Sequence, residues 1–265
     1  KIRYYTSIAG QREYFKDDIY CCPNNYRRII SELPSMIFYK SQNGGISINL
    51  YTASSATIDL SDSTSVDLKQ ETDYPYSGKI EITVSPSQSV SFPLLLRIPA
   101  WAKSVTVTLN GEVQNLNAIP GNFITINRQW EKGDKVQLDI PMDWRLIKGR
   151  KRQAGRVAVM RGPVLFCLNP EKNSGLGLEK LTPDELGRIL LDFSSLKGPF
   201  SDNSIRPDGM LCKIGAWKEG WGMSNGQHDL ELVLTEFPDP GCQATYLNLA
   251  DMSVAMDDEL IKHLK

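Results

Sequence analysis

Apolar and polar residues alternate with a period of two along the sequence from about residue 46 to residue 147. Ile80, Ile82 and Val84, for example, alternate with Glu81 and Thr83. The same pattern returns in four further short runs, at residues 46–50, 105–109, 123–126 and 136–140. Because successive side chains of a strand point to opposite faces, this pattern predicts antiparallel strands with one buried face. Many short strands at this spacing favour a β-sandwich.

Turn signals separate the predicted strands and mark a boundary between two sections. Asn110-Gly111, between two strand-like runs, is a strong signal for a tight hairpin. The basic and polar residues 148–153 mark the boundary, and a second β section follows them. Within it, residues 170–209 are rich in Gly, Pro, Asp and Ser and are predicted to be a long loop. Thr182 is expected to cap a short helix there.

One helical period precedes the strands, at residues 24–39. Apolar residues spaced by three and four form one stripe, made of Tyr26, Ile29, Ile30, Leu33, Met36 and Ile37. Asn24 or Asn25 is expected to cap this helix, and Pro34 to kink or split it.

Size and charge limit the classes of protein to consider. The chain has 265 residues, of which 41% are hydrophobic, enough for one large core or two modest ones. The net charge of -1 gives no reason to expect nucleic acid as a partner. No stretch approaches the roughly 20 apolar residues that a membrane span needs, so no membrane partner is expected. The 5 Cys are too few for a disulfide scaffold, and Cys167 and Cys212 are expected to be buried.

The adjacent cysteines Cys21 and Cys22 are the most reactive feature of the sequence. No local pair of carboxylates suggests a glycosidase site, and neither His228 nor His263 has a partner at metal-ligand spacing. A helix start favours the thiolate form of a cysteine, which attacks carbon or binds metal. The spacing alone leaves three interpretations open: a buried pair, a vicinal disulfide, or a metal or catalytic site. A zinc ion needs four ligands, and the pair supplies two.

At this motif the chain resembles the β-L-arabinofuranosidases of glycoside hydrolase family 127 and their relatives. The segment Cys21–Arg28 (CCPNNYRR), followed by an apolar helix, resembles the Cys-Cys-Pro segment at the end of the family's catalytic barrel. Further matching segments, in the same order, are 94–101 (LLLRIPAW), 105–112 (VTVTLNGE), 123–142 (FITINRQWEKGDKVQLDIPM) and 155–167 (GRVAVMRGPVLFC). The second proline that often follows Cys-Cys-Pro is Asn24 here.

The resemblance implies a retaining glycoside hydrolase that uses a cysteine nucleophile and zinc. Matched by position, Cys21 is the nucleophile and a zinc ligand, and Cys22 is a second zinc ligand. The family's remaining ligands, a Cys and a Glu, and its acid/base Glu match nothing in this chain. The implied partners are a plant-derived arabinose-containing oligosaccharide and the missing catalytic barrel segment, and a homodimer formed through a β-sandwich is left open.

We therefore expect a mainly β chain: two antiparallel β-sandwich sections preceded by a short helical remnant of an (α/α)6 catalytic barrel. The expected ranges are 1–40 for the barrel segment, 41–147 for the first β-sandwich and 148–265 for the second. Such a carboxy-terminal fragment is expected to be inactive alone. The compartment is left open between the periplasm and the cytoplasm of a bacterium.

The alternative to the hydrolase fragment is a non-catalytic carbohydrate-binding or structural β-sandwich module. Trp217 and Trp221 are its candidate sugar-stacking pair, although large aromatic side chains more often serve packing.

Overall fold

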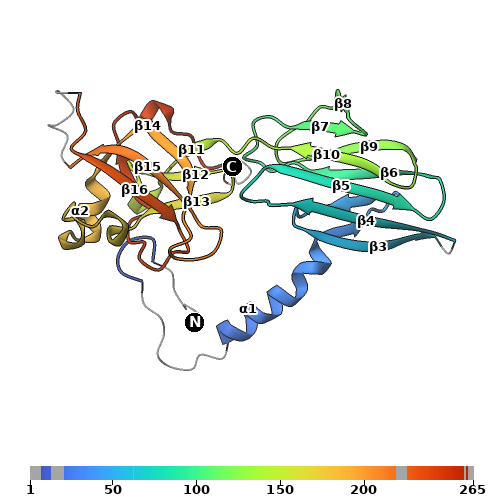
Figure 1. Ribbon diagram of the computed structural model, residues 1–265, viewed down its shortest axis with the longest axis horizontal. Coiled ribbons are helices and arrows are strands. Elements are labelled where there is room, and N and C mark those ends of the chain that lie inside the picture. The colour runs from blue at the N-terminus through green and yellow to red at the C-terminus, as the bar shows by residue number, and fades with distance from the viewer. Residues whose placement is uncertain (1–6, 13–20, 62, 219–225, 260, 262–265) are drawn as a thin grey trace. The chain divides into compact units, whose positions relative to one another are not determined.

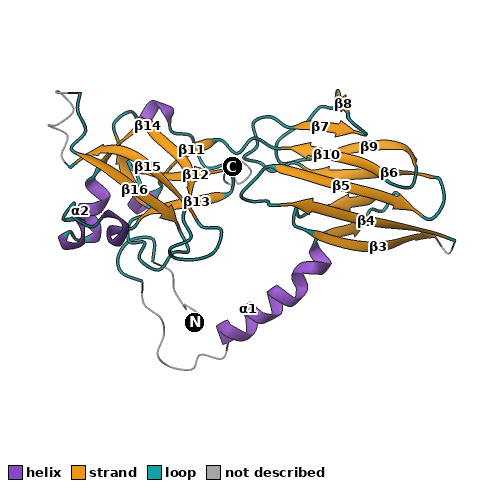
Figure 2. Ribbon diagram, in the orientation of Figure 1, coloured by secondary structure: helices purple, strands orange, loops and turns teal. Residues whose placement is uncertain are grey.

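The computed structural model describes residues 7–12, 21–61, 63–218, 226–259 and 261. The chain divides into two compact units (Figure 1). The middle unit comprises residues 19–142, and the terminal unit combines residues 1–18 with residues 143–265. Strands make up most of the regular structure in both units (Figure 2), so the expectation of a mainly β chain is confirmed.

The middle unit contains two sheets. One has four strands in the order β1-β2-β6-β9, and the other has six in the order β3-β4-β5-β10-β7-β8. The strands of the smaller sheet are β1 (Phe38–Lys40), β2 (Ile46–Ile48), β6 (Val90–Arg97) and β9 (Phe123–Trp130). Those of the larger sheet are β3 (Ser54–Ser61), β4 (Thr64–Thr72), β5 (Lys79–Pro86), β7 (Thr106–Leu109), β8 (Glu112–Gln114) and β10 (Asp134–Asp139). Neighbouring strands are antiparallel except β2 and β6, which are parallel.

The two sheets of the middle unit share one hydrophobic core. Leu94 and Leu96 of the smaller sheet and Ile80 and Ile82 of the larger sheet are all buried in it. Trp130 is fully buried there, and its indole N–H donates to the carbonyl oxygen of Phe92 at 2.9 Å. The alternation seen in the sequence is therefore the burial pattern of the strands, with every second side chain in the core.

The predicted hairpin at Asn110-Gly111 joins β7 to β8. Both residues have positive φ, 49° and 89°, as a tight hairpin turn with primed geometry requires. Asn and Gly tolerate this region of backbone conformation better than other residues, which is why the dipeptide predicts the turn.

Helix α1 (Cys21–Glu32) precedes the strands of the middle unit and continues into the short helix η1 (Leu33–Met36). The expected cap at Asn24 or Asn25 is wrong, because both residues lie inside α1. The expected break at Pro34 is confirmed, since the α-helix ends at Glu32 and η1 contains the proline. The apolar stripe is exposed along α1, with Tyr26 at 56%, Ile29 at 43% and Ile30 at 48%, whereas Ile37 is buried.

The terminal unit contains one seven-stranded sheet in the order β11-β12-β13-β16-β15-β14-β17. Its strands are β11 (Trp144–Lys148), β12 (Val157–Arg161), β13 (Val164–Leu168), β14 (Leu190–Ser201), β15 (Met210–Trp217), β16 (Leu230–Glu236) and β17 (Tyr246–Leu249). Strand β17 pairs with β14 on one side and with β12 on the other. The sheet thus closes on itself, in place of the second pair of stacked sheets that we expected.

Helical turns and the first described residues complete the terminal unit. The short helices are α2 (Pro183–Arg188), η2 (Lys151–Gln153), η3 (Pro170–Asn173), η4 (Leu178–Lys180) and η6 (Met252–Val254). Thr182 caps α2 as expected, in a capping box with Glu185. Residues 7–12 join this unit through a β-bridge between Ala9 and Ala244, whereas the sequence placed them with the segment 1–40. No helix in the described ranges is long and apolar enough to span a bilayer.

Candidate functional site

Cys21 is the first residue of α1, and its side chain is exposed. The interpretation of Cys21 as part of a sealed, buried pair is therefore wrong. The side chain of Cys22 lies outside the described part of the structure, so its role as a ligand stays a prediction.

The other described cysteines are buried in the terminal unit and cannot reach a substrate. Cys167, Cys212 and Cys242 each have 0% exposure, which confirms the prediction for the first two. Burial raises the pKa of Cys212. A hydrogen bond from Cys242 lowers the pKa of Cys167, with further help from Thr245, whose hydroxyl lies 3.6 Å from the Cys167 sulfur. These sulfurs belong to the core, which leaves Cys21 as the exposed cysteine among the described residues.

No complete metal site lies within the described residues. No group of three or more His, Cys, Asp or Glu side chains gathers in a way that could hold an ion in the described ranges. A structural or catalytic zinc takes three or four protein ligands. The described part of the chain offers Cys21 alone at this position and therefore does not by itself fit a zinc ion.

Trp217 and His228 form a packed pair in the terminal unit. Trp217 is only 6% exposed, its ring centroid lies 4.7 Å from that of His228, and its indole N–H donates to the carbonyl oxygen of Gln227. His228 in turn lies 2.9 Å from a carboxylate oxygen of Asp192. The ring face of Trp217 is therefore used for packing, not for sugar stacking, and His228 has a hydrogen-bonded role. Trp221 and His263 lie outside the described residues.

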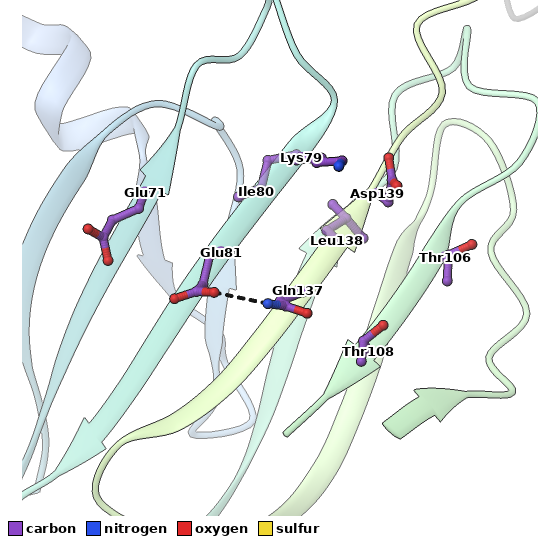
Figure 3. A pocket seen from close by; sticks show the side chains of 9 residues that line it. All are labelled: Glu71, Lys79, Ile80, Glu81, Thr106, Thr108, Gln137, Leu138 and Asp139. Carbon is purple, nitrogen blue, oxygen red and sulfur yellow. Dashed lines mark hydrogen bonds between the residues drawn. The ribbon is translucent and has the colours of Figure 1, made fainter. Parts of the chain in front are cut away.

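A hollow of about 450 Å³ lies on the outer face of the larger sheet of the middle unit (Figure 3). Polar side chains from four strands line it, including Glu71, Glu81, Gln137, Thr106 and Thr108. Figure 3 shows Glu81 of β5 and Gln137 of β10 pointing toward each other, and the side-chain amide of Gln137 donates to the carboxylate at 2.9 Å. These groups can hydrogen-bond a polar ligand.

The hydrogen bonds of Glu81 argue against its use as a general acid. Lys135 donates to its other carboxylate oxygen at 2.6 Å. The hydrogen bonds from Lys135 and Gln137 hold the pKa of Glu81 below its usual range. An acid catalyst must be protonated near neutral pH, so Glu81 is unsuited to that role. The sequence signals for this hollow were the polar residues on the outward faces of β5 and β10.

Most of the middle unit is similar to a domain of a known protein family. Residues 45–142 match the family model described as the middle domain of β-L-arabinofuranosidases of glycoside hydrolase family 127. The resemblance to glycoside hydrolase family 127 is confirmed for this part of the chain. This match covers both sheets of the middle unit except β1, and it begins after α1.

The chain is also similar to proteins of known sequence or structure. A non-reducing end β-L-arabinofuranosidase of Bifidobacterium longum subsp. longum is 29% identical over 162 residues, which are 58% of this chain and 24% of that protein. A solved β-L-arabinofuranosidase of the same family from Geobacillus stearothermophilus is 26% identical, with a TM-score of 0.71, over 86% of this chain and 37% of that one. Another solved glycoside hydrolase is 25% identical, with a TM-score of 0.74, over 91% of this chain and 41% of that one.

The chain spans less than half the length of each of these relatives. The activity for which these relatives are named belongs to proteins much longer than this chain. Its transfer to this chain is a proposal.

Proposed function

We propose that this chain is the carboxy-terminal part of a longer retaining glycoside hydrolase that acts on β-L-arabinofuranosides, with Cys21 as its nucleophile. The observation that carries the proposal is the exposed cysteine on the first turn of α1, the helix that precedes the residues similar to the family 127 middle domain. A plant-derived arabinose-containing oligosaccharide is the substrate that this assignment implies.

In the proposed reaction, the sulfur of Cys21 attacks the anomeric carbon of the terminal sugar. A carbon–sulfur bond forms as the bond to the leaving oxygen breaks, and that oxygen takes a proton from a general acid. Water then attacks the same carbon with general-base help, the carbon–sulfur bond breaks, and the thiolate is restored. Two displacements retain the configuration of the anomeric carbon. The general acid and base is a carboxyl group outside this chain.

Zinc enters the proposal as an ion whose remaining ligands come from polypeptide outside this chain. Cys21 and Cys22 are the two ligands that we assign to it here. The described residues do not complete the coordination of this ion.

The exposed stripe of α1 supports a larger catalytic domain. Tyr26, Ile29 and Ile30 are each at least 43% exposed on this short helix. Isolated helices of this length are marginal in water and depend on packing of their apolar face. We infer that the missing catalytic barrel segment covers this stripe and so fixes the position of Cys21 beside the other catalytic groups.

The test compares the intact polypeptide that includes this chain with the 265-residue chain alone. The intact protein is expected to hydrolyse an aryl β-L-arabinofuranoside, and Cys21→Ser to lower kcat by about 1,000-fold or more because a hydroxyl is a poor nucleophile at neutral pH. Mass spectrometry of protein denatured during turnover should find the sugar on the peptide that contains Cys21.

Cys212→Ala is the matched control, since it removes a buried thiol that no substrate can reach. It is expected to retain activity wherever circular dichroism shows it folded. Hydrolysis by the 265-residue chain alone, or full activity of Cys21→Ser, would contradict the proposal.

A further inference from the structure

A second cavity of the middle unit lies where η1 meets the loops that follow β2, β4 and β6. Its volume is about 270 Å³. Leu33 and Ile37 line it from η1 and its end, and Tyr51, Tyr74 and Arg97 line it from the strand ends. Ligand pockets of proteins usually hold about 300 Å³ or more. This cavity lies just below that size, so any ligand in it is small, such as a single sugar ring.

The two tyrosines are fixed walls of the pocket. The Tyr51 hydroxyl donates to the carbonyl oxygen of Arg97 at 2.6 Å, and the Tyr74 hydroxyl hydrogen-bonds Trp101. Their rings meet edge to face, with centroids 6.0 Å apart. Because both hydroxyls already have partners, the rings offer mainly apolar surface to a ligand.

The guanidinium of Arg97 is the charged group of the pocket. Its charge opposes the increase in pKa that burial causes in Tyr51 and Tyr74, which places it close to both phenols. Within the described part of the chain, no acidic side chain forms an ion pair with Arg97, whereas Arg128 of the same unit pairs with Asp134 at 3.3 Å. An exposed guanidinium without an acid, beside two aromatic rings, is suited to an incoming carboxylate.

Hydroxyl-binding groups complete the lining. Thr52 and Asn49 both face the cavity. The Asn49 amide donates to the carbonyl oxygen of Met36 at 3.2 Å, and its side-chain oxygen remains an acceptor. Apolar walls with a few convergent polar groups are the usual composition of a small-molecule site.

We propose that this pocket binds a uronic acid residue of a polysaccharide, with its carboxylate on Arg97 and its ring against Tyr74. A neutral sugar would leave the guanidinium without a counter-charge, and a small aliphatic acid would leave the apolar walls uncovered. That the sugar belongs to the polymer on which Cys21 acts rests on the proposed function.

The location fits a subsite remote from the reacting bond. Leu33 lines the pocket directly after α1, and Cys21 begins that helix. Twelve helical residues at about 1.5 Å each separate the two by about 18 Å, a distance that a few sugar units can span. Binding of remote parts of a substrate is a recognised source of catalytic efficiency.

The test is calorimetric titration of the 265-residue chain with trigalacturonate, a carboxylate-bearing trisaccharide, and with neutral arabinotriose. Saturable binding is expected for trigalacturonate and at least tenfold weaker binding for arabinotriose. Arg97→Gln is expected to weaken trigalacturonate binding at least tenfold. Arg27→Gln, which removes an exposed arginine of α1 in the same unit, should leave it unchanged. Circular dichroism checks that each variant is folded.

Three outcomes would overturn this inference. They are no binding of trigalacturonate by the unaltered chain, equal losses in Arg97→Gln and Arg27→Gln, and competition by acetate at the same concentration as trigalacturonate. The first means that the pocket is not a site, the second that attraction is non-specific, and the third that only the carboxylate is recognised.

The proposed function is tested separately from this pocket. Titration needs no turnover, so Cys21→Ser should bind trigalacturonate as the unaltered chain does. If the intact protein hydrolyses the substrate but the chain does not bind trigalacturonate, the pocket proposal fails. If the chain binds trigalacturonate but the intact protein is inactive, the proposed function fails.

Discussion

Arg12 is a buried cation, 8% exposed, in the terminal unit. It donates to the carbonyl oxygens of Ser7, Phe237 and Asp239, and it stacks 4.2 Å above the Phe237 ring. Arg12→Met keeps much of the bulk but removes every donor, so buried carbonyls lose their partners. We expect the free energy of unfolding of the terminal unit to fall by about 2 kcal/mol.

Urea denaturation followed by tryptophan fluorescence measures this loss. Arg150→Met is the control, because Arg150 is exposed and should cost no more than about 0.5 kcal/mol. Equal stability of the two variants would show that the buried donors of Arg12 contribute nothing.

Asp192 gives the terminal unit a specific dependence on acid. Burial raises the pKa of Asp192, but hydrogen bonds from Ser194 and His228 outweigh it, so the pKa lies below its ordinary value. A depressed carboxylate stabilises the fold above its unfolded pKa of about 3.9, and that contribution is lost as the pH falls through the folded pKa. Asp192→Asn should therefore destabilise the unit at pH 7 and make little difference near pH 2.

Paired urea titrations at pH 7 and at low pH measure this difference. Asp229→Asn is a comparison, since the Asp229 carboxylate accepts a hydrogen bond from the backbone N–H of Lys218. If the difference in free energy of unfolding between the unaltered protein and Asp192→Asn stays constant with pH, ionisation of Asp192 does not contribute to stability.

At the scale of the element, strand β15 packs against a ring that cannot move. A Cβ atom at Gly215 would lie 2.3 Å from the Nδ1 atom of His228, and Asp192 and Trp217 hold that ring in place. Gly215→Ala should cost about 2 kcal/mol of stability through overpacking. Adding His228→Ala should recover part of that loss, because the space for the new methyl group then exists.

A double-mutant cycle on unfolding free energies checks the clash directly. A coupling of about 1 kcal/mol or more is expected between the two positions, and additive effects would contradict the packing argument. Gly187→Ala is the comparison, since its new methyl group meets only the flexible end of Arg156, at 2.8 Å.

The sequence predicted regular strands better than irregular ones. Strand β5 follows the alternation of Ile80, Ile82 and Val84 closely. Strand β14 lies inside the stretch expected to be a long loop. Its pairing with β15 shifts register between Asp192 and Lys197 and again between Lys197 and Phe200. Such bulges interrupt the period of two on which the prediction depended. The local composition therefore gave no sign of β14, which forms through its pairing with β15.

The candidate site was predicted by motif, and its surroundings were not. The sequence singled out Cys21, and the structure shows it exposed at the start of α1. Nothing local indicates that Tyr51, Tyr74 and Arg97 meet in one pocket, since they come from three separate strand ends. Convergence of this kind depends on topology, which periodicity does not encode.

At the scale of the whole molecule, segments far apart in the sequence make up the terminal unit. Residues 7–12 are more than 130 positions from the first strand of that unit in the sequence, yet they pair with its end. The Gly10 N–H donates to Gln243 at 2.7 Å, and the Thr245 N–H donates to Ile8 at 3.0 Å. The sequence could not predict this pairing, because so short a segment has no recognisable strand pattern.

Deleting residues 1–12 should weaken the terminal unit and leave the middle unit unchanged. The deletion removes the Ala9–Ala244 bridge and all the donors of Arg12, whereas the middle unit has a separate hydrophobic core. Hydrogen exchange followed by mass spectrometry reports on each unit in the same sample. Amides of β13 and β16 are expected to exchange faster, and those of β4 and β5 at the unaltered rate. Deletion of residues 1–6 alone keeps the bridge and serves as the control, so equal acceleration in both units, or in both deletions, would show that residues 7–12 do not belong energetically to the terminal unit.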